Sequence, residues 1–92
     1  CRKHVILGMM ANKNHNEYIN YFKDIETLTT INIPNQPNAI RGEDLKNKIN
    51  NFSNIDYKDS LESAISSIKI QKNDIILITG SLYLAGEVLN LN

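Results

Sequence analysis

The chain has 92 residues, enough for one domain with a small hydrophobic core. Its hydrophobic fraction of 41% and charged fraction of 22% exclude a disordered chain and a membrane-embedded one. The formal net charge is zero and the Lys and Arg residues are spread along the sequence, so we expect neither a nucleic acid nor a membrane as the partner.

The ends of the chain and its cysteine content add to these limits. No apolar run approaches the ~20 residues that span a bilayer, and the first residues lack the layout of a signal peptide, so we expect a cytoplasmic protein. Cys1 is the only cysteine, which excludes an internal disulfide and a Cys-rich zinc site. Because the chain starts on Cys1 and runs directly into a predicted strand, we expect residues 1–92 to be a single domain cut from a longer protein.

The first predicted elements are a buried strand and a helix. Residues 4–7 (HVIL) form a β-prone run that ends at Gly8. Asn14 and Glu17 have the spacing of a capping box, in which two side chains satisfy free N–H groups at a helix start. Apolar residues follow at helical spacing, which predicts a helix that runs to about Asp24.

A second strand and a long loop come next. Residues 27–33 (TLTTINI) contain alternating apolar and many β-branched residues, which predicts a strand that ends at Pro34. Residues 34–42 contain both prolines and a glycine, and loops of this length between a strand and a helix are often functional. Glu43 and Asp44 then occupy the first turn of a predicted helix, whose apolar face consists of Leu45, Ile49 and Phe52.

The last third of the chain contains the run around which the domain is organised. Residues 55–57 predict a short edge strand, and residues 59–62 are typical of a helix start. Residues 75–78 (IILI) form an unbroken apolar run, as in a strand that helices cover on both faces. Residues 79–81 (TGS) break this run, and we expect Ser81 to cap a last helix that carries Leu82, Ala85, Val88 and Leu89.

Strands and helices therefore alternate along most of the chain. This order predicts an α/β fold of three to four strands and about four helices, with a Rossmann-like, mostly parallel sheet flanked by helices. The carboxyl ends of parallel strands lie at one edge of such a sheet, and ligands bind at that edge.

Four residues are candidates for a site at this edge. Lys13 and Ser81 follow the first and the last strand, so we expect them to face one crevice, where a cation and a helix N-terminus suit a carboxylate or a phosphate. Arg41 lies in the long loop, and Tyr83 in the first turn of the last predicted helix. Each also has an ordinary explanation: an exposed Lys or Arg, a Ser that only caps a helix, or a Tyr in the core.

Several common sites are absent from the sequence. Neither G-x-x-x-x-G-K-[ST] nor G-x-G-x-x-G occurs, so the chain has no recognised nucleotide-phosphate loop. The main predicted strands end at Gly8, Pro34 and Gly80 rather than at a phosphoacceptor Asp or Cys. His4 is expected to pack within or at the edge of the sheet, His15 lacks the partners of a catalytic triad, and no metal-ligand spacing occurs.

Two stretches resemble one protein family. Residues 5–14 (VILGMMANKN) are similar to the GMxxDKD segment of bacterial folylpolyglutamate synthase/dihydrofolate synthase, and residues 78–89 (ITGSLYLAGEVL) resemble the closing VTGSxyxxGEVL of that family. Arg41 and Gly42, with Leu45, stand where the family has an R(A/G)…L stretch. The resemblance covers nearly the whole chain in order, and its closing motif is specific.

The resemblance implies the C-terminal domain of a Mur-ligase-like enzyme. Such enzymes use ATP to convert a carboxylate to an acyl phosphate, which an amino acid attacks through its amino group. In this family the acceptor is dihydropteroate or a folate, and the amino acid is glutamate. The glutamate-binding set carried over is Lys13, Ser81, Arg41 and Tyr83, with no catalytic residue and no metal ligand in this chain. Two asparagines, Asn12 and Asn14, stand where the family often has Asp, which changes the charge around Lys13.

The family's DGAHNP segment and its P-loop domain would precede Cys1. That domain would bind most of the ATP and Mg²⁺, so we expect this chain to bind no cofactor and to be inactive without the P-loop domain, in the same or a separate chain. Two interpretations stay open. One is the glutamate-side domain of a folate ligase. The other is a stand-alone, non-catalytic α/β module that binds a small anion or a partner protein, or a degenerate remnant of the ligase.

Overall fold

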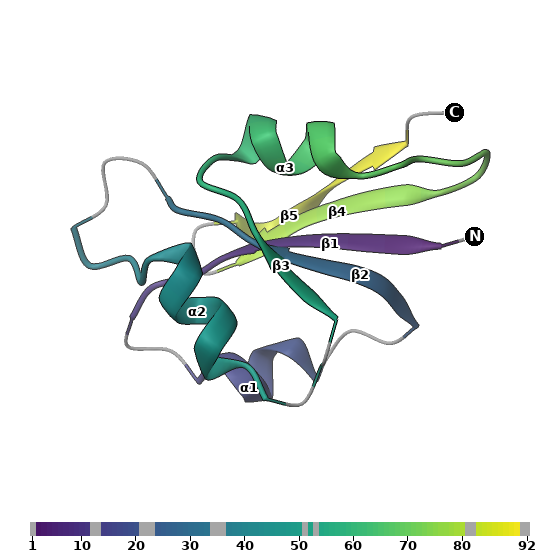
Figure 1. The fold of residues 1–92 in the computed structure, drawn as a ribbon. Coiled ribbons are helices and arrows are strands. Elements are labelled where there is room, and N and C mark those ends of the chain that lie inside the picture. Colours follow the sequence, from purple (N-terminus) through teal and green to yellow (C-terminus); the bar gives the residue numbers. More distant parts are fainter. Residues whose placement is uncertain are drawn as a thin grey trace.

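A single sheet with helices on both faces forms the domain (Figure 1). The computed structural model describes residues 2–11, 14–20, 24–33, 37–50, 52, 54–80 and 83–90, and residues 83–90 by their backbone alone. The elements in chain order are β1 (Lys3–Gly8), α1 (His15–Ile19), β2 (Ile25–Thr30), α2 (Gly42–Lys48), β3 (Ile55–Tyr57), α3 (Leu61–Ser67), β4 (Ile75–Gly80) and β5 (Tyr83–Asn90). The described residues thus contain five strands and three helices, against the predicted three to four strands and about four helices.

The sheet confirms the predicted α/β class. Its strand order is β3-β2-β1-β4-β5, and the first four of these strands are parallel to one another. β1 lies in the middle, and its last residue, Gly8, is in register with Gly80, the last residue of β4. The two long apolar runs of the sequence are therefore neighbouring central strands that end at the same edge, as the parallel topology requires.

The predicted helix at the end of the chain is wrong. Residues 83–90 form β5, which pairs with β4 in an antiparallel hairpin, so a strand stands where the helix was predicted. Gly86 would cost about 1 kcal/mol in a helix interior, whereas Tyr, Val and Leu are well suited to a strand. Pairing with the edge of β4 satisfies the backbone groups of this segment, and tertiary pairing of this kind overrides a weak helical pattern.

The other predicted elements are present with different ends. α1 ends at Ile19 and Asp24 has a φ of 60°, so the helix stops before the predicted end at Asp24. β2 runs from Ile25 to Thr30 instead of over residues 27–33, because the chain leaves the sheet after Thr30 to cross toward α2. The short edge strand β3 is confirmed at residues 55–57.

Local capping explains where two of the helices begin. The Asn14 side chain accepts a hydrogen bond from the Glu17 N–H at 3.0 Å, which confirms Asn14 as the cap of α1. The second bond differs from that of a capping box, because the Glu17 carboxylate accepts from the Asn14 side-chain amide, at 3.2 Å. The Ser60 hydroxyl likewise accepts from the Ser63 N–H at 3.1 Å at the start of α3.

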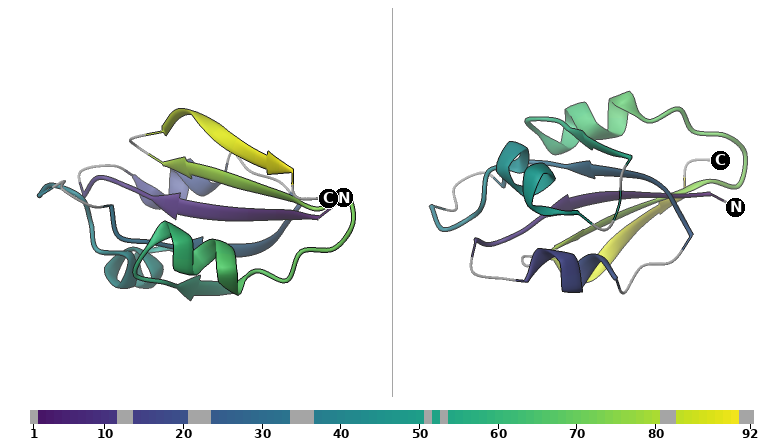
Figure 2. Two further views of the ribbon diagram at one scale, coloured as in Figure 1. Left: turned by 90° about the horizontal axis from the view of Figure 1, so that it is seen from above. Right: turned by 60° about the horizontal axis from the view of Figure 1, so that its bottom comes forward.

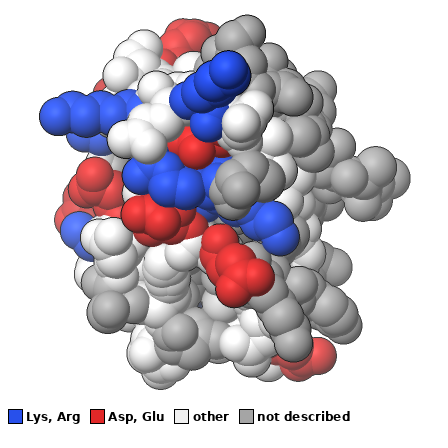
Figure 3. All heavy atoms as spheres, turned by 90° about the vertical axis from the view of Figure 1, so that its right-hand side faces the viewer, with Lys and Arg blue, Asp and Glu red and all other residues white. Residues whose placement is uncertain are grey.

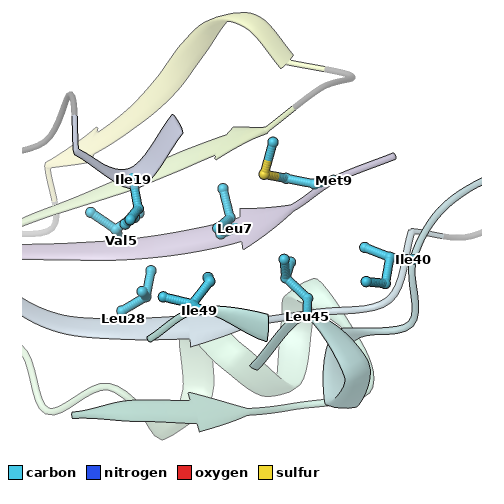
Figure 4. Close-up of a cluster of buried hydrophobic side chains, with 8 residues drawn as sticks. All are labelled: Val5, Leu7, Met9, Ile19, Leu28, Ile40, Leu45 and Ile49. Carbon is cyan, nitrogen blue, oxygen red and sulfur yellow. The ribbon is translucent and has the colours of Figure 1, made fainter. Parts of the chain in front are cut away.

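Two apolar clusters hold the layers together. α1 and α2 lie on one face of the sheet and α3 on the other (Figures 1 and 2). The first cluster joins β1 and β2 to α1 and α2, as Figure 4 shows, and consists of Val5, Leu7, Met9, Ile19, Leu28, Ile40, Leu45 and Ile49. The second cluster lies under α3 and consists of Ile6, Ile31, Ala64, Ile76 and Ile78. In the described part of the chain, no helix is long and apolar enough to cross a membrane.

Candidate functional site

The loops that follow β1 and β2 are joined at the carboxyl edge of the sheet. Met10 and Ala39 form an isolated antiparallel bridge. On either side of it, the Ile40 N–H donates to the Met9 carbonyl at 3.0 Å, and the Ala11 N–H donates to the Asn38 carbonyl at 2.9 Å. The segment that leads to Arg41 is therefore held beside the loop that leads toward Lys13.

A histidine at the start of α1 also holds this loop. His15 is buried, and its Nε2 donates to the Met10 carbonyl at 3.1 Å. The hydrogen is on Nε2 because a carbonyl oxygen can only accept. His15 thus ties α1 to the loop after β1, which is a positional role and not that of a triad member.

Polar side chains fix the backbone on the other side of Arg41. The Gly42 N–H donates to Asn32 Oδ1 at 2.7 Å, and the Gly42 carbonyl accepts from the Thr30 hydroxyl at 2.6 Å. Asn32 Nδ2 in turn donates to the Tyr57 hydroxyl at 3.0 Å. Gly42 is buried, so both of its backbone groups have partners in a place that water cannot easily reach.

Residue 42 has no room for a side chain. A Cβ placed there would lie 2.7 Å from Cδ1 and Cε1 of Tyr57 and 2.8 Å from the carbonyl carbon of Ile31. The small residue after Arg41 therefore lets the start of α2 pack directly against the ends of β2 and β3.

Arg41 itself is exposed at this edge. It is the N-cap residue of α2, with extended backbone angles, and its side chain makes no capping hydrogen bond. Within the described ranges, the guanidinium also has no ion pair. The structure thus combines a firmly held backbone with a guanidinium that is available to a carboxylate or a phosphate, the groups that Arg binds in a bidentate manner.

The contacts of the other predicted site residues stay predictions. The described residues do not include Lys13 and Ser81, although the strands that precede them end side by side. The helix that Ser81 was expected to cap is absent from residues 83–90, which form β5. Tyr83 is the first residue of β5 and not part of a helical turn, and its backbone alone is described.

A buried ionic cluster lies at the opposite, amino edge of the sheet. The Arg2 guanidinium binds the Asp74 carboxylate through Nη2 at 2.8 Å and through Nε at 3.2 Å. The same carboxylate accepts from His4 Nε2 at 3.1 Å and from the Gln71 N–H at 3.0 Å, and His4 Nδ1 lies 2.9 Å from the Thr27 hydroxyl. His4 was expected to be a packed or edge residue, and the structure shows it buried with two partners.

The cluster shifts the acidity of its carboxyl group. Hydrogen bonds from Arg2 hold the pKa of Asp74 well below its usual range, and those from Gln71 and His4 add to this effect, which burial opposes. The reciprocal contact raises the pKa of Arg2. Around this edge, basic and acidic side chains are intermingled (Figure 3), so it presents no field of a single sign to a ligand.

A shallow groove among the described residues lies elsewhere. It has a volume of about 760 Å³, runs beside α3 and is lined by Tyr57, Lys58, Asp59, Glu62, Ser63, Ser66 and Ser67. Two acidic side chains and one lysine make it a poor receptor for an anion, and none of the predicted site residues lines it. No group of three His, Cys, Asp or Glu side chains among the described residues could hold a metal ion.

Comparison with known proteins gives one match. The model of a family described as "Mur ligase, glutamate ligase domain" matches residues 1–82. No curated protein and no solved structure matches the chain. The match takes in Lys13, Arg41 and Ser81, and it ends at the residue before Tyr83.

Proposed function

The chain belongs to the family of the Mur ligase glutamate ligase domain, and from this premise we propose that it supplies the glutamate side of a folate ligase. The family indicates one part of an ATP-dependent amide ligase that pairs with an N-terminal ligase domain. The folate acceptor is the finer part of the proposal and is supported by the resemblance of residues 5–14 and 78–89 to folylpolyglutamate synthase/dihydrofolate synthase.

The proposed reaction has two steps. ATP phosphorylates a carboxylate of dihydropteroate or a folate, which gives an acyl phosphate and ADP. The glutamate nitrogen then attacks the acyl carbon and loses a proton, the bond to the phosphate oxygen breaks, and an amide and inorganic phosphate result. ATP and Mg²⁺ are assigned to the N-terminal domain, so this chain would bind and orient glutamate. The amino group must reach the acyl carbon, and a held carboxylate restricts where it can lie.

The observation that carries the proposal is that Arg41 lies in a fixed backbone segment and has an exposed guanidinium. Its two neighbours hold it in place, since Ile40 is hydrogen-bonded to the loop after β1 and Gly42 to Asn32 and Thr30 at the end of β2, whereas its guanidinium is exposed at the carboxyl edge. A guanidinium bound to a glutamate carboxylate would contribute about 1.5–3 kcal/mol per hydrogen bond. Lys13 and Ser81, which follow β1 and β4, and Tyr83, the first residue of β5, are proposed to complete the glutamate contacts.

Glutamate-dependent ADP release with dihydropteroate tests this function. The chain would be assayed alone, mixed with a P-loop domain of the family, and in mixtures that carry Arg41→Ala or Ser81→Ala. We expect activity in the mixture alone, with a glutamate KM at least tenfold higher for Arg41→Ala, since a charge-assisted contact is lost. Lys72→Ala, an exposed cation in the turn before β4, serves as the matched control and should leave the KM unchanged.

The outcomes separate the two interpretations of the sequence. Activity that falls with Arg41→Ala and not with Lys72→Ala would support the glutamate-side role. No activity in any mixture, with each mixture folded, would reject it and favour a non-catalytic module that binds a small anion or a partner protein, or a ligase remnant.

A further inference from the structure

We propose that Asn32 is a positioning residue that sets the place of the Arg41 guanidinium at the carboxyl edge. This inference rests on the proposed function, because it assigns Asn32 a task in glutamate binding that it performs through Arg41. Asn32 lies just after β2, in no predicted motif, and its importance follows from its contacts alone.

The three helices differ in how their first N–H groups are satisfied. The N-cap residues of α1 and α3 are Asn14 and Ser60, and their side chains accept hydrogen bonds from N–H groups of the first helical turn. The N-cap residue of α2 is Arg41, whose side chain contains no hydrogen-bond acceptor and therefore cannot bind these N–H groups. Asn32 instead accepts, from another part of the chain, a hydrogen bond from the first N–H of α2, that of Gly42, at 2.7 Å, and so anchors the start of this helix.

This anchor has a consequence for position 41. A Ser, Asp or Asn there would cap α2 by binding an N–H of its first turn, but such a side chain is short and turns back onto the helix. With the helix start held at Gly42 by Asn32, α2 begins in a fixed place although its N-cap residue is an Arg with an exposed side chain. The anchor from outside the helix thus supports a cation at a place where helix formation alone would favour a short acceptor.

Asn32 is itself held in one orientation. Its Oδ1 accepts from the Gly42 N–H, while its Nδ2 donates to the Tyr57 hydroxyl at 3.0 Å. A flipped amide would place its NH2 group against the Gly42 N–H, where neither group could accept a hydrogen bond. The ring of Tyr57 stands where a Cβ of residue 42 would be. β2, β3 and the start of α2 are therefore connected through one side chain, directly beside Arg41.

Glutamate titration of the chain, followed through its backbone amide NMR signals, tests the inference without any need for ligase activity. The variants are Asn32→Ala, Arg41→Ala, the double variant, and Tyr57→Phe, which keeps the ring and removes only the hydroxyl. Asn47→Ala, an exposed asparagine on α2, is the matched control. The rate of hydrogen exchange at the Gly42 amide reports, in each variant, whether its hydrogen bond to Asn32 is lost.

We expect Asn32→Ala to weaken glutamate binding about three- to tenfold and Tyr57→Phe to weaken it less, as the loss of one neutral hydrogen bond suggests. In the Arg41→Ala background, Asn32→Ala should add less than about twofold, because the residue it positions is already gone. Exchange of the Gly42 amide should be faster in Asn32→Ala than in the Asn47→Ala control.

Two results would overturn the inference. The first is that Asn32→Ala weakens glutamate binding by the same factor with and without Arg41, or leaves the affinity unchanged although the Gly42 amide exchanges faster. In either case Asn32 does not act through Arg41, and the proposed function stands. If Arg41→Ala leaves the affinity unchanged or the wild-type chain binds no glutamate, the role of Arg41 fails together with the inference. Should Asn32→Ala not fold, the same cycle with Tyr57→Phe decides the question.

Discussion

Substitution of Gly42 by Ala tests how tightly the start of α2 is packed against the sheet. The new methyl group would lie 2.7 Å from two ring carbons of Tyr57 and 2.8 Å from the Ile31 carbonyl carbon, where carbon atoms normally approach to about 3.5–4.0 Å. Neither neighbour can move easily. The Ile31 contact is backbone, and its N–H is bound to the Leu7 carbonyl at 3.0 Å, while the Tyr57 hydroxyl is bound to Asn32.

The expected change in the free energy of unfolding is the difference between a cost and a gain. Overpacking of this kind costs about 1–3 kcal/mol, and a Gly to Ala change in a helix gains at most about 1 kcal/mol. We therefore expect the free energy of unfolding to fall by about 1–2 kcal/mol, which lowers Tm by roughly 4–16 °C in a domain of this size. Arg41 would also be displaced, so glutamate affinity should fall with stability.

Urea unfolding followed by circular dichroism measures the change, and Gly8→Ala is the matched control. A Cβ at Gly8 would lie 2.8 Å from Cγ1 of Ile33, an atom of a side chain that can change rotamer. We expect the loss for Gly8→Ala to be the smaller of the two. If Gly42→Ala is as stable as the wild type, or loses no more than Gly8→Ala, the argument from close packing at α2 is refuted.

Two further predictions concern the amino edge and the first helix. Because the folded-state pKa of Asp74 is lowered, its contribution to stability is present above the unfolded-state value of about 4 and is lost as the pH falls from about 5 toward the folded-state pKa. Urea midpoints from pH 2 to 6 should therefore rise less steeply with pH in Asp74→Asn, and an unchanged slope would contradict the assignment. Asn14→Ala should lower the free energy of unfolding by about 1 kcal/mol, with Asn14→Ser closer to the wild type because its hydroxyl keeps an acceptor without a second carboxylate beside Glu17, and equal losses in both variants would argue against capping.

Much of the fold could be predicted because it depends on neighbours in the sequence. The apolar runs of β1 and β4 and the cap at Asn14 act over a few residues, and the structure has them where they were predicted. The start of α3 was likewise predicted within residues 59–62, and the structure assigns its cap to Ser60. Ligand binding at the carboxyl edge was predicted from topology, and Arg41 lies there with an exposed side chain. Glutamate contacts by Lys13, Ser81 and Tyr83 stay predictions.

The hydrogen bonds that could not be predicted join residues that are far apart in the sequence. Asn32 shows no signal by itself, because its two partners are Gly42 and Tyr57. Asp74 likewise shows no signal by itself, because Arg2 and His4, which bind it, lie about seventy positions away. Such contacts cannot be read from local spacing, since no periodicity connects residues that only folding brings together.

Local propensity and apolar periodicity were thus enough to determine the α/β class, most of the strands and the helix starts. Tertiary structure decided the rest. Residues 83–90 became a strand because β4 offered an open edge whose backbone groups required partners, and this outweighed a modest helical pattern. The position of Arg41 was decided in the same way, because the hydrogen bonds that hold the residues on either side of it come from the end of β2 and from the loops after β1 and β2, and those segments meet α2 only in the folded sheet.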